Sequence, residues 1–231
     1  MDLTQVLRQH FGTTQQAQIE IKKLPVKINS LNSSCRMLGQ SPKDWQDLLE
    51  LAPWADALEV PLLRVFDGKP SQASAANSHL VEANIFFDWW NAQKAKNNWR
   101  VDIMIETHSI LTTSKTIQKL QRVLKKPARI LWDSHHTWFK GREEPDYTWR
   151  AIRPWVSHIH FKDSPQPQSL NDKPSYCIPG CGEFPLIPIF RILCDAEFSG
   201  PVSLEWEKQW HPELPPLEEA LTACQFPGWA V

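Results

Sequence analysis

Short apolar runs alternate along the chain with segments of helical periodicity. Residues 26–31 alternate apolar and polar side chains, as a half-buried strand does. Five further runs have the length and apolar content of buried strands, and they cover residues 62–66, 101–105, 128–132, 156–161 and 201–205. The pattern therefore predicts six strands separated by helices.

The segments between these runs carry helix start signals and helical spacing. Ser41 precedes Pro42 and an acid follows, which is the usual order of an N-cap and a first helical turn. A helix beginning at Ser114 places Ile117 and Leu120 on one face. Further helices are expected at about 14–23, 74–96, 146–155, 186–196 and 217–223, with the first 25 residues as a helix-rich lead-in.

The alternation of strand and helix predicts an α/β fold with parallel strands and right-handed crossovers. A doubly wound sheet and a TIM (β/α) barrel both meet that description. No Gly-x-Gly-x-x-Gly turn follows any of the strands, so the dinucleotide-binding version of the open sheet is disfavoured. We therefore expect a barrel.

Composition is that of an ordinary globular protein. The 231 residues are 42% hydrophobic and 22% charged, and the formal net charge is −1, which excludes general disorder and a basic surface for nucleic acid. No run approaches the roughly 20 apolar residues of a membrane helix. The N-terminus lacks signal-peptide features, and the five cysteines are odd in number and scattered. We expect one cytoplasmic domain over residues 1–231, with no membrane or nucleic-acid partner.

Candidate chemistry stands at the ends of four successive predicted strands. Glu106, Asp133, His160 and Glu205 are separated by 27, 27 and 45 residues, close to one or one and a half strand–helix units. In an α/β barrel these strand ends converge on one mouth. A divalent cation is the natural way to hold three crowded carboxylates, and oxygen ligands with one imidazole suit Mn²⁺, Mg²⁺ or Co²⁺. Taken alone, each acid could instead be a solvated group at a strand end, and His160 could be a buried core histidine.

The motifs around these residues resemble the xylose isomerase-like TIM-barrel superfamily, in particular its sugar phosphate isomerase/epimerase branch. They occur in the order Ile105-Glu106-Thr107-His108, Trp132-Asp133-Ser134-His135-His136, His158-Ile159-His160-Phe161-Lys162-Asp163, Gly180-Cys181-Gly182 and Ser203-Leu204-Glu205. The resemblance covers about residues 24 to 210. Each piece is weakly specific, and the combination at this spacing is more so.

The resemblance implies that Glu106, Asp133, His160 and Glu205 bind one divalent metal ion. It implies further that Glu106 and Glu205 are the catalytic acid and base on opposite faces of a sugar or sugar phosphate, and that His136 contacts substrate. The expected reaction is isomerisation or epimerisation by proton transfer through an enediolate. An arginine that the family's epimerases carry after the strand-end histidine is replaced by Gln166.

For several other side chains the sequence leaves two roles open. Arg64 could hold a substrate oxygen or pair with a nearby acid. Lys162 could reach a substrate hydroxyl or phosphate, and a surface ion pair with Asp163 is favoured. His108 and His135 could lie behind the ligands, with His108 touching substrate, or be exposed. Glu207 is a rival ligand to Glu205, and His158 is expected to be a core histidine.

The number of strands departs from the family. Only six strands are predicted, and the family's first two have no counterpart. Open sheet edges invite association, so we expect a homo-oligomer or reduced stability. Two alternatives to the isomerase stay open: an endonuclease IV-like metal-dependent phosphodiesterase, and a truncated barrel that binds metal or a partner without turnover.

Overall fold

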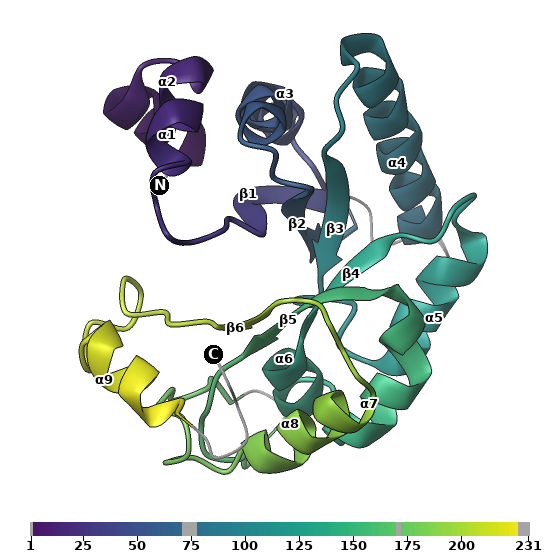
Figure 1. Ribbon diagram of the computed structural model, residues 1–231. Helices are drawn as coiled ribbons and strands as arrows, with labels where there is room; N and C mark the ends of the chain where they lie inside the picture. The colour runs from purple at the N-terminus through teal and green to yellow at the C-terminus, as the bar shows by residue number, and fades with distance from the viewer. Residues whose placement is uncertain (1, 71–77, 170–171, 226–231) are drawn as a thin grey trace. The chain divides into compact units, whose positions relative to one another are not determined.

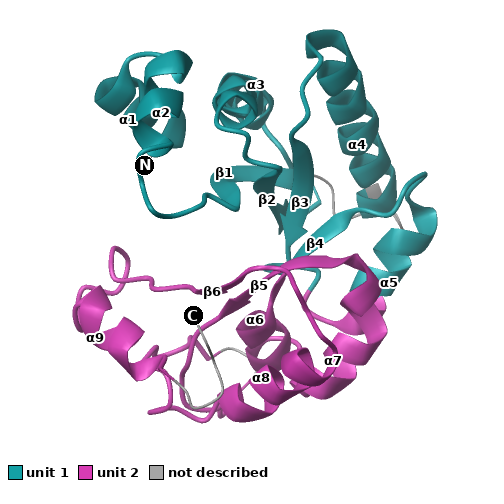
Figure 2. Cartoon of the chain, in the orientation of Figure 1, with its two compact units in different colours: residues 1–111, 116–131 teal, residues 112–115, 132–231 magenta. Residues whose placement is uncertain are grey.

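The computed structural model describes residues 2–70, 78–169 and 172–225. The chain divides into two compact units, residues 1–111 with 116–131 and residues 112–115 with 132–231 (Figure 2). The described strands form a parallel α/β sheet in the order β1-β2-β3-β4-β5-β6, which is the order of the chain. The predicted α/β class and the count of six strands are confirmed.

Unit 1 holds the N-terminal helices and the first strands (Figure 1). Its elements are α1 (Leu3–Phe11), α2 (Thr14–Ile21), β1 (Ser30–Leu38), α3 (Pro42–Ala57), β2 (Leu62–Gly68), α4 (Ser78–Asn97), β3 (Asp102–Glu106) and most of α5 (Ser114–Val123) and β4 (Arg129–Asp133). β1, β2, β3 and β4 pair in parallel in that order.

Unit 2 takes in the start of α5, the last two residues of β4 and the elements that follow. Its elements are α6 (Ser134–Phe139), α7 (Pro145–Ile152), a 3₁₀ turn at Arg153–Trp155, β5 (Val156–Phe161), α8 (Leu186–Asp195), β6 (Val202–Leu204) and α9 (Leu217–Ala223). β5 and β6 pair in parallel, with His160 opposite Ser203. This register brings the ends of the two strands together.

The first turn of α3 has the cap that its sequence predicts. The Ser41 hydroxyl accepts a hydrogen bond from the Asp44 amide, and the Asp44 carboxylate accepts one from the Ser41 amide at 2.7 Å. This capping box satisfies amides that have no partner within the helix. Asp44 also binds Arg36 at 3.0 Å, so the same carboxylate joins the start of α3 to β1.

The core of unit 1 is built from the strands. Leu62, Met104 and Leu131, from three neighbouring strands, form one buried cluster. On the face of α3, Leu48 is fully buried. Because consecutive strands register in parallel, Glu106 at the end of β3 lies opposite Leu131 of β4.

The prediction for the first strand is wrong in position. The structure has β1 at Ser30–Leu38 rather than residues 26–31. Ser33 and Cys35 are buried on the same side as Leu31, so a serine occupies an inward position of this strand. Its hydroxyl donates to the Arg64 carbonyl at 2.7 Å, which makes that burial tolerable.

One further element differs from the sequence-based picture. The short helix α6 was not predicted, because it follows directly on a strand without a linker. Among the five cysteines, all of them described, Cys35 is buried, whereas Cys181 and Cys194 are exposed. Residues 74–77 of the expected helix at 74–96 lie outside the described residues.

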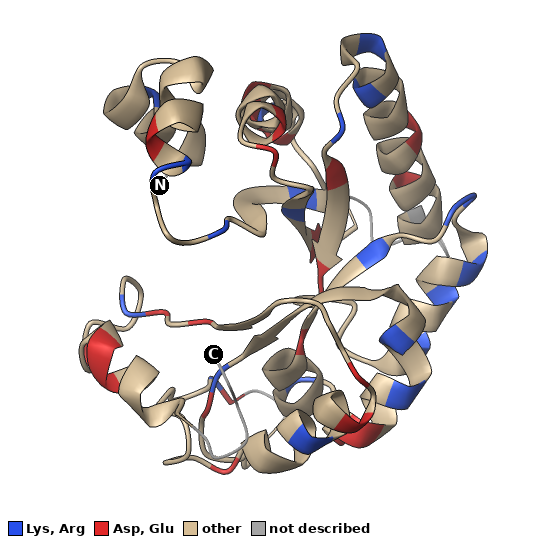
Figure 3. Ribbon diagram, viewed as in Figure 1, with Lys and Arg blue, Asp and Glu red and all other residues tan. Residues whose placement is uncertain are grey.

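Charge and hydropathy agree with the composition. Basic and acidic residues are spread over the helices of each unit (Figure 3). Among the described residues, no helix is both long and apolar enough to span a bilayer. β1 and β6 stand at the two ends of the strand order, and association through their edges stays a prediction.

Replacing Leu48 with Ala tests the packing of unit 1. The side chain is fully buried, so its removal leaves a cavity and should lower the free energy of unfolding by about 2–5 kcal/mol. Leu24→Ala is the matched control, since Leu24 is 53% exposed and its loss should cost less than about 0.5 kcal/mol. Urea denaturation followed by circular dichroism measures both, and equal costs would contradict the described core.

Candidate active site

Asp133 ends β4 and begins α6. One of its carboxylate oxygens accepts the His136 amide at 2.8 Å as the N-cap of the helix, and the other lies 3.0 Å from His136 Nδ1. Asp133 is fully buried and His136 nearly so. The helix start therefore fixes the carboxylate and the imidazole as one unit.

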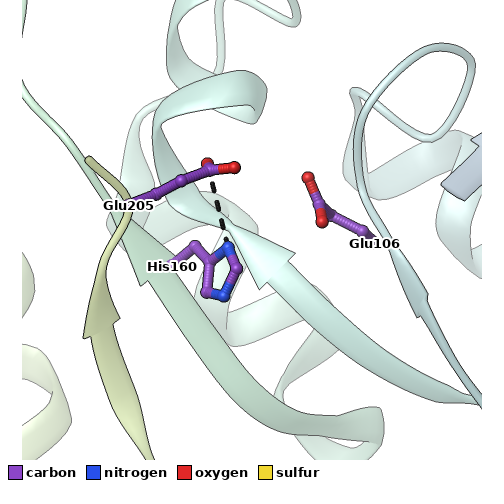
Figure 4. Close-up of side chains that lie close together, drawn as sticks. All are labelled: Glu106, His160 and Glu205. Carbon is purple, nitrogen blue, oxygen red and sulfur yellow. Dashed lines mark ion pairs between the residues drawn. The ribbon is translucent and has the colours of Figure 1, made fainter. Parts of the chain in front are cut away.

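His160 and Glu205 lie at the ends of the paired strands β5 and β6. The Glu205 amide donates to the Phe161 carbonyl at 2.9 Å, which extends the pairing by one residue. The Nδ1 atom of His160 lies 3.8 Å from Glu205 Oε2, and the two side chains point toward one another (Figure 4). The register of two strands thus joins an imidazole and a carboxylate that are 45 residues apart.

A buried lysine joins these carboxylates. The Lys162 ammonium lies 3.0 Å from Asp133 Oδ2, 2.5 Å from Glu205 Oε2 and 2.9 Å from Glu207 Oε1. It also stands 5.2 Å from the centre of the Tyr176 ring. Its side chain is only 2% exposed, so this is an interior cation surrounded by three acids. We call Asp133, His160, Lys162 and Glu205 the charged cluster.

The electrostatics of the charged cluster favour full ionisation. Burial alone would lower the pKa of Lys162, but Asp133 and Glu205 outweigh it and raise that pKa well above its usual value. Burial alone would raise the pKa of Asp133, but His136 and Lys162 hold it well below its usual value. Against the same effect of burial, Lys162 and the neighbouring His160 lower the pKa of Glu205 to about 2. The acids are anionic and the lysine cationic at neutral pH.

Unit 1 contributes a second pair of charges. Arg64 on β2 lies opposite Met104 on β3, and its Nε is 3.2 Å from Glu106 Oε2. The guanidinium also lies 4.0 Å from the centre of the Phe66 ring, which contacts the His108 ring at 4.6 Å. Glu106, drawn in Figure 4, is fully buried. Of the two readings of Arg64, the structure shows the pairing with an acid.

Two aspartates near strand ends each hold a loop, because their carboxylates accept hydrogen bonds from the backbone amides of that loop. Asp67 in β2 accepts the amides of Ile110 and Leu111 at 2.7 Å each, and the loop after β3 is tied down. Ile110 and Leu111 then line a cavity of about 260 Å³ with Met37 and Leu38. The motifs gave no sign of this role, because a carboxylate that binds amides has no fixed sequence spacing.

Asp163 is the equivalent in unit 2. Its carboxylate accepts the amides of Gly180 and Gly182 on one oxygen, at 2.8 and 3.0 Å, and that of Phe184 on the other, at 3.1 Å. A side chain on Gly182 would collide with the Asp163 carboxylate, which explains the glycine. The predicted surface ion pair of Lys162 with Asp163 is therefore wrong: Lys162 is buried among other acids, and Asp163 binds a loop.

Of the other histidines in the motifs, two are buried and one is partly buried. His135 is fully buried and not exposed, and its Nε2 lies 2.8 Å from Ser164 Oγ. His158 is a core histidine, as predicted, 2.8 Å from Ser203 Oγ. Burial lowers the pKa of His135 to about 3 and that of His158 to about 4, so both are neutral. His108 is partly buried beside Phe66 and bonds Ser109 at 2.9 Å.

Tyr176 is a site residue that the motifs did not reveal. Its ring contacts His135 on one side and His211 on another, with centroid distances of 5.6 and 5.0 Å. Burial raises the pKa of its hydroxyl well above the usual value. It reaches Lys162 from a loop, and a lone tyrosine in a loop carries no signal that could have found it.

The fold and the motifs agree with one protein family. The family model described as xylose isomerase-like TIM barrel matches residues 12–226. The chain belongs to the xylose isomerase-like TIM barrel family. The match includes residues of both units and all four residues predicted to bind metal.

Solved structures with the same fold include those of the IolI protein and of an epimerase, YcjR. The IolI protein, crystallised with a bound zinc atom, is 13% identical with a TM-score of 0.73, over 96% of this chain and 81% of that one. The 3-keto-D-glucoside 4-epimerase YcjR from E. coli is 10% identical with a TM-score of 0.66, over 92% of this chain and 82% of that one. At such identities the similarity shows the xylose isomerase-like fold alone.

A curated relative is similar in part. The alpha subunit of 3'-dehydrocarminate deglycosidase from a Microbacterium species is 38% identical over 74 residues, which are 31% of this chain. Those residues make up 17% of that subunit, so the chain matches about a sixth of its length.

Replacing Asp163 with Asn tests the loop anchor. An amide has one acceptor oxygen, and its NH₂ group would face a backbone N–H in either orientation, because both carboxylate oxygens are occupied. We expect the free energy of unfolding to fall by about 1–3 kcal/mol. Amide hydrogen exchange of residues 177–184 should accelerate.

Asp172→Asn is the control for this change. Asp172 also accepts backbone amides, that of Ser169 among others, but it is an exposed residue. It should leave exchange at 177–184 unchanged. Equal exchange rates in Asp163→Asn and the native protein would show that Asp163 does not hold the loop.

Proposed function

We propose that the protein is a divalent-metal-dependent isomerase or epimerase that acts on a sugar by proton transfer next to a carbonyl group. The observation that carries the proposal is the charged cluster: two ionised carboxylates and an imidazole, gathered from three strand ends around a buried cation. Such a concentration of buried charge is costly to fold and is typical of functional sites.

The residues fit a divalent metal. Asp133, Glu205 and His160 offer two carboxylates and an imidazole, a donor set that suits Mn²⁺, Mg²⁺, Co²⁺ or Zn²⁺. Asp133 and Glu205 are both ionised, so they supply two negative charges that a divalent ion would balance. The zinc atom in the IolI structure is consistent with such a site in this fold.

We propose Glu106 as the fourth ligand. It ends β3 opposite Leu131, and β4 continues from Leu131 to Asp133, so both acids stand where their strands end. Ends of neighbouring parallel strands lie at the same edge of a sheet. The family resemblance implies the same four residues.

The proposed chemistry assigns proton transfer to the two glutamates. A bound divalent ion would polarise the carbonyl and stabilise an enediolate. Glu205 is ionised at neutral pH, so its carboxylate has lone pairs to accept the proton on carbon. Glu106 in its acid form would return a proton on the other face, and Arg64, 3.2 Å away, would balance the carboxylate that is left.

Substrate contacts are proposed for the polar groups around the ligands. His136 is held by Asp133 and is nearly buried, so its imidazole orientation is fixed before substrate binds. Arg64, Lys162 and His108 are the other groups expected to meet substrate oxygens. A fixed donor beside the reacting centre contributes by orienting the sugar.

The activity of a structurally similar protein supports a carbonyl-bearing sugar as substrate. One is an epimerase that acts on carbon 4 of a 3-keto glucoside. Epimerisation beside a ketone needs removal and return of the adjacent proton, which is the chemistry assigned to Glu205 and Glu106. A keto sugar is therefore the first substrate class to examine.

Metal content and proton exchange test the proposal. Protein purified without chelator should hold about one divalent ion per chain, and should exchange the proton beside the carbonyl of a keto sugar in D₂O. Glu106→Gln and Glu205→Gln should each lower that exchange at least 10²-fold, because an amide cannot accept the proton.

Glu219→Gln is the control, since Glu219 is exposed on α9 and should exchange as the native protein does. NMR follows the exchange and elemental analysis the metal. Native exchange rates in both Glu106→Gln and Glu205→Gln would refute the assignment.

A further inference from the structure

Lys162 is bonded to the very atoms that the proposed metal site needs. Its ammonium approaches Asp133 Oδ2 at 3.0 Å and Glu205 Oε2 at 2.5 Å. The second oxygen of Asp133 is already taken by the His136 amide as the cap of α6. The remaining oxygen, Oδ2, lies 3.0 Å from both Lys162 Nζ and His136 Nδ1, and of these two neighbours Lys162 is the one held as a cation.

An ammonium and a divalent ion cannot share these oxygens at close range. Two like charges a few ångströms apart in a buried site repel each other by several kcal/mol at an effective dielectric constant near 20. With 2% exposure, Lys162 has little water to screen it. Binding of a divalent ion at Asp133 and Glu205 requires Lys162 to release them.

The structure also contains a place for the released ammonium. Glu207 lies beyond the end of β6, and its Oε1 is 2.9 Å from Lys162. The face of Tyr176 stands 5.2 Å from the same nitrogen, and cations bind favourably to aromatic faces. Glu207 and Tyr176 can keep Lys162 after it leaves the two ligands.

We propose that Lys162 is an exchangeable counter-ion, which occupies Asp133 and Glu205 in the metal-free protein and moves onto Glu207 and Tyr176 when a divalent ion binds. The inference rests on the metal site proposed above. It gives Glu207 the role of a positioning residue, which acts on the metal through Lys162 and is not a ligand.

A double-mutant cycle on Mn²⁺ affinity tests this exchange. Lys162→Met removes the competing cation and should lower the Kd for Mn²⁺ at least tenfold. Glu207→Gln removes the carboxylate that would hold the released ammonium, so Lys162 stays on the ligands and the Kd should rise about tenfold. In the Lys162→Met background, Glu207→Gln should leave the Kd within about twofold. Isothermal titration calorimetry on the full chain measures each value.

The control is Lys125→Met, which deletes one positive charge from an exposed pair with Asp88 and should leave the Kd unchanged. Thermal unfolding gives a second readout. Metal-free Lys162→Met should melt lower than the native protein, because the acids have lost their counter-ion, and Mn²⁺ should raise its Tm by more than it raises the native Tm.

The outcomes separate this inference from the proposed function. Native protein that binds no Mn²⁺ would overturn both. Native protein that binds Mn²⁺, with Lys162→Met unchanged or weaker, would overturn the counter-ion role and leave the metal site standing. A loss of affinity from Glu207→Gln that persists in the Lys162→Met background would make Glu207 a ligand. If Lys162→Met does not fold, Lys162→Gln takes its place in the same cycle.

Discussion

The balance of charge around Lys162 is the constraint on which unit 2 depends. Asp133, Glu205 and Glu207 bring three negative charges to one buried ammonium, and each alone would be costly to remove from water. Their mutual attraction repays that cost only while the strand ends stay in register. The same ion pairs that hold β4, β5 and β6 together at this edge therefore also define the candidate active site.

Much of the fold followed from the sequence because its strands are short apolar runs that end at polar residues. β3, β4 and β5 begin within a residue of their predicted starts, and the polar strand ends were located for the same reason. β1 was misplaced because Ser33 points inward, and a buried hydroxyl is only recognisable once its acceptor, the Arg64 carbonyl, is known. Patterns of hydropathy do not contain such partners.

The sequence indicated which residue types carry the chemistry of the site, but not which of these side chains pair with one another. Lys162 and Asp163 are neighbours in sequence, which favoured a pair, but successive side chains of extended backbone point to opposite sides. Lys162 accordingly joins acids 29 and 43 residues away, and Asp163 joins amides of a later loop. Tyr176 reaches the site from a loop for which no periodic pattern exists.

The two loop-holding aspartates make tolerance to mutation uneven. Asp67 and Asp163 each gather several backbone amides onto one carboxylate, so the shape of a whole loop depends on a single side chain. Apart from Gly182, which has no room for a side chain, changes of loop side chains leave these bonds in place, because the bonds come from the peptide groups. A change at Asp67 or Asp163 would therefore disturb the path of a whole loop, whereas a change of an exposed loop side chain would stay local.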